Sequence, residues 1–139
     1  MRKVAVGILL SLFFISCGKK NDIINYVPYV AVNEIVQIND PNYTLNGIGG
    51  HALIDGGVKG IVVYHRSDGN YVAYDRCSSY EPEKRCAVNI DEVAFQVVDP
   101  CSGSKFLLDD GTPVKAPASR SLRSYTVIKR NIYELQIVN

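Results

Sequence analysis

Four cysteines are the residues of this 139-residue chain with the greatest capacity for chemistry. Cys17 follows an apolar stretch near the start, whereas Cys77, Cys86 and Cys101 lie in the second half, where Asp99 closely precedes the last of them. Thiolates and carboxylates bind metal ions, and pairs of thiols form disulfides in oxidising compartments. The three later cysteines therefore indicate either a metal centre or a disulfide with one thiol left over.

The N-terminal segment has the charged, apolar and small-residue parts of a secretory signal. It begins Met-Arg-Lys and continues with an almost wholly apolar run at residues 4–15. At about twelve residues this run is too short to span a bilayer, which needs about 20. The Phe-Ile-Ser-Cys at residues 14–17 resembles a lipobox. We therefore expect residues 1–16 to be a lipoprotein signal peptide, Cys17 to carry the lipid, and residues 17–25 to be a tether.

The remaining residues, 26–139, have the composition and pattern of one folded, all-β domain. Hydrophobic residues make up 47% of the chain, and the formal net charge of +1 gives no indication of a nucleic-acid partner. Short β-type runs are broken by Gly, Pro, Asn and Asp, and no longer stretch has a helical period. We expect strands at residues 30–38, 51–54, 61–66, 71–75, 93–98, 105–108, 125–129 and 133–138.

Turns and one irregular loop separate these runs. Ser-Asp-Gly-Asn at residues 67–70 and Asp-Asp-Gly at residues 109–111 are typical of hairpin turns in which glycine takes a positive φ, and Asn131 indicates a third turn. The glycines at residues 47–60 precede no helix, which argues against a phosphate loop. Residues 78–91 have no regular pattern, so we expect a surface loop there.

Several motifs follow one another in a recognisable order. Tyr-Val-Ala-Tyr-Asp-Arg-Cys occupies residues 71–77, Asp-Pro-Cys-Ser-Gly-Ser-Lys-Phe occupies residues 99–106, and Ala-Pro-Ala occupies residues 116–118. In this order the chain resembles the Rieske iron–sulfur domain family, in which a strand leads into a C-x-H loop and a C-P-x-H-G-S-x-F loop follows. The resemblance covers roughly residues 60–139. It implies an all-β, antiparallel β-sandwich with a small cluster-binding-type subdomain at about residues 75–106.

The resemblance also assigns four cluster-ligand positions. A Rieske centre holds one iron through two thiolates and the other through two imidazoles, and each loop supplies one of each. Cys77 matches the first thiolate, but Ser79 stands at the first imidazole position, Asp99 at the second thiolate position and Ser102 at the second imidazole position. Hydroxyls are poor ligands for iron. The resemblance therefore implies a degenerate cluster site, and we expect no cofactor.

A disulfide between the two loops is a second implication of the resemblance. High-potential Rieske domains have such a bridge, and Cys101 matches its second-loop partner, while Cys86 lies a little beyond the matching position, near Pro82. The resemblance thus favours Cys86–Cys101, with Cys77–Cys101 and Cys77–Cys86 as alternatives. A different ligand set, Cys77, Cys86, Cys101 and Asp99, is the alternative for a metal ion or an unconventional 2Fe-2S cluster.

These expectations together predict a membrane-anchored module and not an enzyme. The lipid on Cys17 would hold it in the cell envelope, facing the periplasm or the cell surface, with an envelope protein as its partner. No Gly-x-Ser-x-Gly elbow indicates a hydrolase. The alternative function is electron transfer by a 2Fe-2S cluster on the unconventional ligand set.

Overall fold

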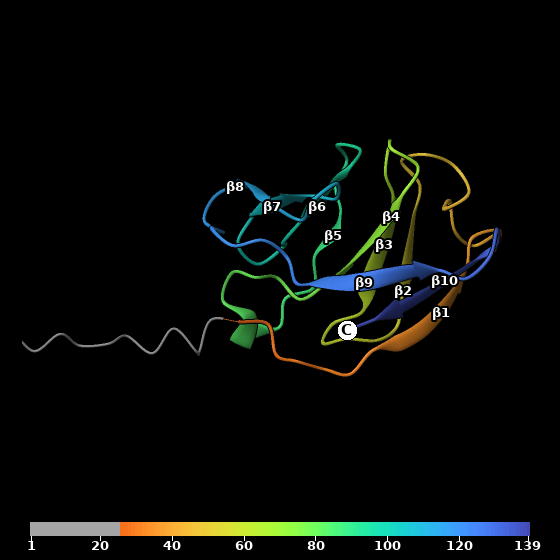
Figure 1. The fold of residues 1–139 in the computed structure, drawn as a ribbon. Coiled ribbons are helices and arrows are strands. Elements are labelled where there is room, and N and C mark those ends of the chain that lie inside the picture. The colour runs from red at the N-terminus through yellow and green to blue at the C-terminus, as the bar shows by residue number, and fades with distance from the viewer. Residues whose placement is uncertain (1–25) are drawn as a thin grey trace, which may run out of the picture.

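The computed structural model describes residues 26–139 as two antiparallel β-sheets with one short 3-10 helix (Figure 1). The all-β expectation is confirmed. The expected signal peptide, the lipidation site Cys17 and the tether at residues 17–25 lie outside the described residues. Within the described part of the chain, no helix is long and apolar enough to cross a membrane.

The larger sheet has six strands in the order β1-β10-β9-β4-β3-β2. It changes direction at β9, which pairs with β4 only at its first residues and with β10 along the rest. In Figure 1, β9, β10 and β1 consequently cross the direction of β2, β3 and β4, so that the sheet curls around a core. The strands are β1 (Asn33–Gln37), β2 (His51–Ile54), β3 (Ile61–His65), β4 (Tyr71–Asp75), β9 (Ser124–Lys129) and β10 (Glu134–Val138).

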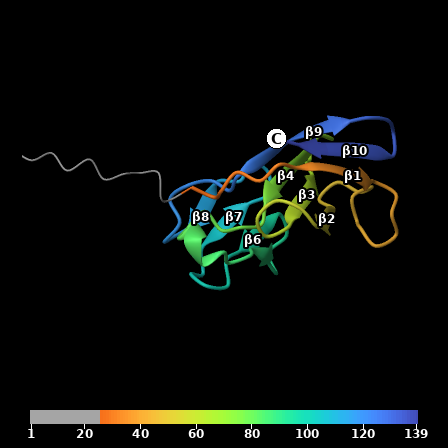
Figure 2. The same ribbon diagram turned by 90° about the horizontal axis from the view of Figure 1, so that it is seen from below.

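The smaller sheet has four strands in the order β5-β6-β7-β8 and forms a separate layer, as both views show (Figures 1 and 2). Its buried side chains pack on β3 and β4, on the faces directed away from the first core. The strands are β5 (Asn89–Ile90), β6 (Gln96–Val98), β7 (Lys105–Leu107) and β8 (Pro113–Lys115).

Strand β3 separates the two cores and is buried on both faces. Ile61 and Val63 point into the core of the larger sheet, whereas Val62 and Tyr64 pack against the smaller sheet. Side chains of a strand alternate between its faces, so a strand covered on both sides needs an unbroken apolar run. The Ile-Val-Val-Tyr sequence meets this need and fixes β3 at the centre of the domain.

The three expected turns are confirmed. Residues 67–70 join β3 to β4 and residues 109–111 join β7 to β8, with φ of 82° at Gly69 and 77° at Gly111. Asn131 lies in the turn between β9 and β10, where its side-chain oxygen accepts a hydrogen bond from a backbone amide.

The expected strand at residues 93–98 is wrong in its first half. Strand β6 begins only at Gln96, and Phe95 is half exposed with φ of 63°. The chain turns here because β6 follows β5 after a connection of a few residues and pairs with it in the antiparallel direction.

Strands β5 and β8 were not expected, since two or three residues are too few to show an alternating pattern. The smaller subdomain therefore extends through β8, beyond the expected limit at residue 106.

The segment at residues 78–91 is not simply a surface loop, which corrects a second expectation. It contains the 3-10 helix η2 (Pro82–Lys84) and β5, and both Ser78 and Val88 are buried. The amide of Ser78 donates to the carbonyl of Cys86 at 2.8 Å, so the segment folds back on itself. This backbone pairing lets the segment enter the interior without leaving its polar groups unsatisfied.

Candidate functional site: two loops joined by a disulfide

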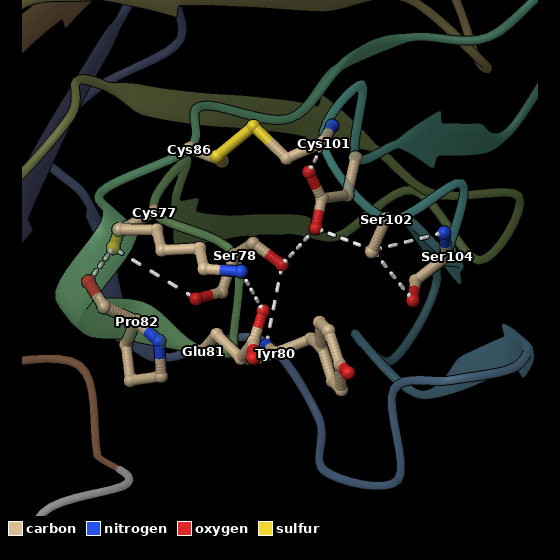
Figure 3. The surroundings of a disulfide bond; sticks show 11 residues. Cys77, Ser78, Tyr80, Glu81, Pro82, Cys86, Cys101, Ser102 and Ser104 are labelled. Carbon is tan, nitrogen blue, oxygen red and sulfur yellow. Dashed lines mark hydrogen bonds and ion pairs between the residues drawn. A yellow bond between two sulfur atoms is a disulfide. The ribbon is translucent and has the colours of Figure 1, made fainter.

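Two loops meet beside the smaller sheet, at the place where the motifs predicted a cluster site (Figure 3). The first loop, residues 76–88, connects β4 to β5, and the second, residues 99–104, connects β6 to β7. A disulfide between Cys86 and Cys101 joins them, with 6.3 Å between the two Cα atoms. The favoured pairing is confirmed. The two alternative pairings are wrong, because Cys77 is a free thiol.

Cys77 is completely buried, and its thiol points away from the second loop. Its sulfur lies 3.6 Å from the carbonyl oxygen of Pro82 and 3.8 Å from that of Ser78. In Figure 3 this places the thiol against the η2 segment and not against the disulfide. Burial, followed by the nearby carboxylate of Asp75, raises the pKa of the Cys77 thiol to about 11. At neutral pH the group is therefore a protonated thiol, which is neither a nucleophile nor a ready metal ligand.

Asp99 joins the two loops a second time through hydrogen bonds. Its side chain is buried, and its Oδ2 accepts from the hydroxyl of Ser78 in the first loop at 2.8 Å and from that of Ser102 at 2.6 Å. Its Oδ1 accepts from the amide of Cys101 at 2.9 Å. A buried carboxylate is stable when hydrogen bonds compensate for its lost hydration. Asp99 here acts as the centre of a polar network.

The two serines at imidazole positions have different surroundings. Ser102 belongs to the Asp99 network and is also hydrogen-bonded to the Ser104 hydroxyl at 2.9 Å. Ser79 lies outside that network, since its hydroxyl donates to the carbonyl of Arg120 at 2.6 Å. Of the four ligand positions named by the motifs, the structure thus brings together only Asp99 and Ser102.

One group of potential metal ligands occurs within residues 26–139. The ligand atoms of Cys86, Asp99 and Cys101 lie within 4.8 Å of one another, and Cys77 is not part of this group. Both sulfurs of the group are joined in the disulfide, so neither is a thiolate. The alternative ligand set of three thiolates and a carboxylate is therefore not assembled in the disulfide-bonded form.

The residues present do not fit a Rieske cluster. Such a cluster needs two thiolates and two imidazoles, whereas the corresponding positions hold a protonated thiol, two hydroxyls and a hydrogen-bonded carboxylate. We derive no chemistry through an iron–sulfur centre from this arrangement.

Asp75 supports the first loop and was missed in the sequence. At the end of β4 it is completely buried, and it accepts hydrogen bonds from the Tyr125 hydroxyl at 2.7 Å, the Val58 amide at 2.6 Å and the Cys77 amide at 2.7 Å. Burial, together with the hydrogen bond to Asp75, raises the pKa of Tyr125. A Cβ on Gly57 would overlap this carboxylate and phenol. An acidic residue that ends an otherwise apolar strand is the signal that predicts such a buried acceptor.

Comparison with solved structures places this arrangement in a known fold. A scan against family models and a search of curated proteins both found no match. The cyanobacterial plasma membrane Rieske protein PetC3 from Synechocystis PCC 6803 is similar, with a TM-score of 0.55 and 20% identity over 80% of this chain and 100% of that chain. The ferredoxin of carbazole 1,9a-dioxygenase from Nocardioides aromaticivorans IC177 is also similar, with a TM-score of 0.50 and 16% identity over 79% of this chain and 98% of that one. The chain therefore has a Rieske-like fold.

Proposed function

We propose that this chain is a membrane-anchored lipoprotein whose Rieske-like domain is a non-catalytic accessory or binding module. The observation that carries the proposal is the chemistry of the four ligand positions, which hold a protonated thiol, two hydroxyls and a hydrogen-bonded carboxylate in place of two thiolates and two imidazoles. The Cys86–Cys101 disulfide joins the same two loops, as a disulfide also does in high-potential Rieske domains. The bridge and the Asp99 network together fasten these loops without a metal.

The disulfide and the Asp99 network both contribute to holding the two loops together. With a sequence separation of 15, the disulfide stabilises the fold by about 3 kcal/mol on the chain-entropy model. The hydrogen bonds that Asp99 accepts from Ser78 and Ser102 add to this, because breaking them would strand buried polar groups. The two loops are therefore held together by interactions that do not involve a metal.

Anchoring in the cell envelope is supported by two separate features. The first feature is the resemblance of residues 14–17 to a lipobox, in which the cysteine, here Cys17, carries the lipid. The second is the Cys86–Cys101 disulfide, because disulfides persist in the oxidising compartments that exported proteins reach. One structurally similar protein is itself a plasma membrane Rieske protein. We propose that the domain faces the periplasm or the cell surface and binds an envelope protein there.

The cofactor part of the proposal is tested by spectroscopy and metal analysis. The full chain is purified anaerobically from membranes, and its visible spectrum, iron content and acid-labile sulfide are measured. The proposal expects a colourless protein without stoichiometric iron, and non-reducing peptide mapping that finds Cys86 linked to Cys101. Stoichiometric iron with charge-transfer bands would instead make this an electron-transfer protein with an unconventional ligand set.

The anchoring part is tested by metabolic labelling with an alkyne fatty acid. The proposal expects label on the wild-type chain and recovery of that chain in the membrane fraction. Cys17→Ser is expected to remove the label, whereas Cys77→Ser, a matched control, keeps the label. Labelling of the Cys17→Ser chain would contradict the assignment of the anchor.

A further inference from the structure

The disulfide and its neighbouring carboxylate bring three potential metal ligands to one place, which the function proposed above does not use. The ligand atoms of Cys86, Asp99 and Cys101 lie within 4.8 Å of one another. In the oxidised chain the two sulfurs are bonded to each other and are not thiolates. Reduction of the bridge would leave two thiols and a carboxylate side by side.

The bridge is open to a reductant on the side of the second loop. It links the two loops through Cys86 and Cys101 (Figure 3), and Cys101 is exposed whereas Cys86 is half-buried. A thiolate breaks a disulfide by attacking one sulfur and displacing the other, and exposed disulfides are the more labile ones. We therefore expect an external dithiol to attack Cys101 and to release Cys86.

The carboxylate of Asp99 is oriented and still has room for a metal ion. Its Oδ2 accepts hydrogen bonds from the hydroxyls of Ser78 and Ser102, and its Oδ1 accepts from the amide of Cys101. An ionised carboxylate has about four acceptor sites, so one site on Oδ1 is left for a metal ion. Carboxylates that bind metals are themselves oriented by hydrogen bonds of this kind.

We propose that the reduced chain binds a zinc ion through the thiolates of Cys86 and Cys101 and the carboxylate of Asp99. Zinc accepts both sulfur and oxygen ligands, whereas Cu(I) prefers sulfur and Mg²⁺ prefers oxygen. Two sulfurs bound to one tetrahedral zinc lie roughly 3.8 Å apart. The ligand atoms already lie within 4.8 Å, so small side-chain rotations bring them to the metal. Water takes the fourth position, on the exposed side of Cys101.

The exchange of the bridge for the metal balances in atoms and electrons. A protein dithiol gives two electrons and two protons to the bridge, so that Cys86 and Cys101 become thiols and the dithiol becomes a disulfide. Zinc then replaces the two thiol protons, which go to solvent. A second protein disulfide reverses the change by taking two electrons, which reforms the bridge and releases the zinc. The metal and the bridge are thus alternative links between the same two loops.

Zinc titration before and after reduction tests the proposal. The full chain carrying Cys17→Ser, which removes the cysteine outside the described residues, is reduced anaerobically with a phosphine, a reductant that has no thiol. Zinc is titrated by calorimetry, and Co²⁺ is then bound in its place for spectroscopy. We expect equimolar zinc in the reduced chain, thiolate-to-cobalt charge-transfer bands, and no saturable binding by the oxidised chain.

Variants identify the ligands. Cys86→Ser with Cys101→Ser should abolish zinc binding by the reduced chain. Asp99→Asn removes the charge of a ligand and Ser102→Ala removes a hydrogen bond that orients it, so each should weaken binding by about tenfold or more. Cys77→Ala is the matched control and should keep the full affinity, because Cys77 is not part of the cluster.

Several results would overturn the proposal. These are absence of equimolar zinc binding by the reduced chain, equal binding by the oxidised chain or by the double cysteine variant, and a loss of binding in Cys77→Ala. Urea unfolding gives a second readout, since a metal that binds only the folded chain stabilises it. Zinc should raise the unfolding midpoint of the reduced wild type and of Cys77→Ala, and it should leave that of the double variant unchanged.

The outcome is independent of the function proposed above. Iron in the chain as purified would contradict the accessory role, whereas the zinc titration starts from the metal-free, disulfide-bonded chain. Failure of the zinc test would in turn leave the anchoring and the accessory role untouched, because neither depends on the reduced form.

Discussion

Replacing both bridged cysteines, Cys86→Ser with Cys101→Ser, is expected to lower the free energy of unfolding by about 3 kcal/mol. The bridge has a sequence separation of 15, and on the chain-entropy model a loop of that length restricts the unfolded chain by this amount. For a domain of roughly 110 residues the loss corresponds to a fall in the unfolding temperature of about 12 °C. The expected effect is therefore far larger than the error of a standard unfolding experiment.

Equilibrium urea unfolding with and without a reducing agent measures this loss. The chain has nine tyrosines and no tryptophan, so far-UV circular dichroism and tyrosine fluorescence are the suitable signals. Reductant should lower the wild-type stability to that of the double variant and leave the double variant unchanged. Cys77→Ala is the matched control, because it removes a buried cysteine but keeps the bridge and should keep the full response to reductant.

Two results would refute the reasoning. Equal stability of the wild type and the double variant under oxidising conditions would mean that the bridge between Cys86 and Cys101 does not constrain the chain. A full response to reductant in the double variant would mean that another disulfide, involving Cys77, supplies the stability. Either result would remove the main support for loops that are closed without a metal.

Three further predictions concern the interior around the loops. Asp99→Asn should lower the free energy of unfolding, measured by urea unfolding, by about 2–3 kcal/mol, because the amide group of the new side chain faces buried hydrogen-bond donors. Asp109→Asn, which removes an exposed ion pair, is the control and should lower the same free energy by less than about 1 kcal/mol. Gly57→Ala should lower the free energy of unfolding by about 2–4 kcal/mol, because the new Cβ would overlap neighbouring side-chain atoms and the residue has a positive φ. Gly69→Ala also has a positive φ but open space around it, and it should lower the free energy of unfolding by about 1 kcal/mol. Equal losses in the two variants would contradict the overlap at Gly57. Cys77 should resist alkylation at pH 8 until urea unfolds the chain. The pKa of the Cys77 thiol is about 11 in the folded chain and 9.0 for an ordinary thiol, so the free energy of unfolding should fall as pH rises above about 9, and it should fall less in Cys77→Ala.

Strands with several alternating residues could be predicted from the sequence, and shorter ones could not. Strands β3 and β4 carry long apolar or alternating runs, and the turn at residues 67–70 has the expected Asp-Gly pair. The two residues of β5 acquire their conformation from pairing with β6, which brings Ile90 opposite Val97. A strand of this length forms because a neighbouring strand pairs with it, and it is too short to show an alternating pattern in the sequence.

Much of the candidate site also followed from the order of motifs. The motifs at residues 71–77 and 99–106 identified the two loops that meet, and the resemblance favoured the Cys86–Cys101 pair. The roles of the other ligand-position residues were beyond this reasoning. The hydroxyl of Ser102 donates to Asp99, whereas that of Ser79 donates to the carbonyl of Arg120, which lies far away in the sequence. Which serine is hydrogen-bonded to Asp99 therefore depends on contacts that only the folded chain makes.

The amino-acid sequence by itself determined the all-β class, the hairpin turns and which segments would form the site, because alternation, glycine turns and motif order are local properties of the chain. Only the tertiary structure decided that Cys77 is a buried thiol and that Asp75 and Asp99 are buried acceptors. Burial and hydrogen bonding depend on residues that are far apart in the sequence, and these residues come into contact only when the two sheets pack together.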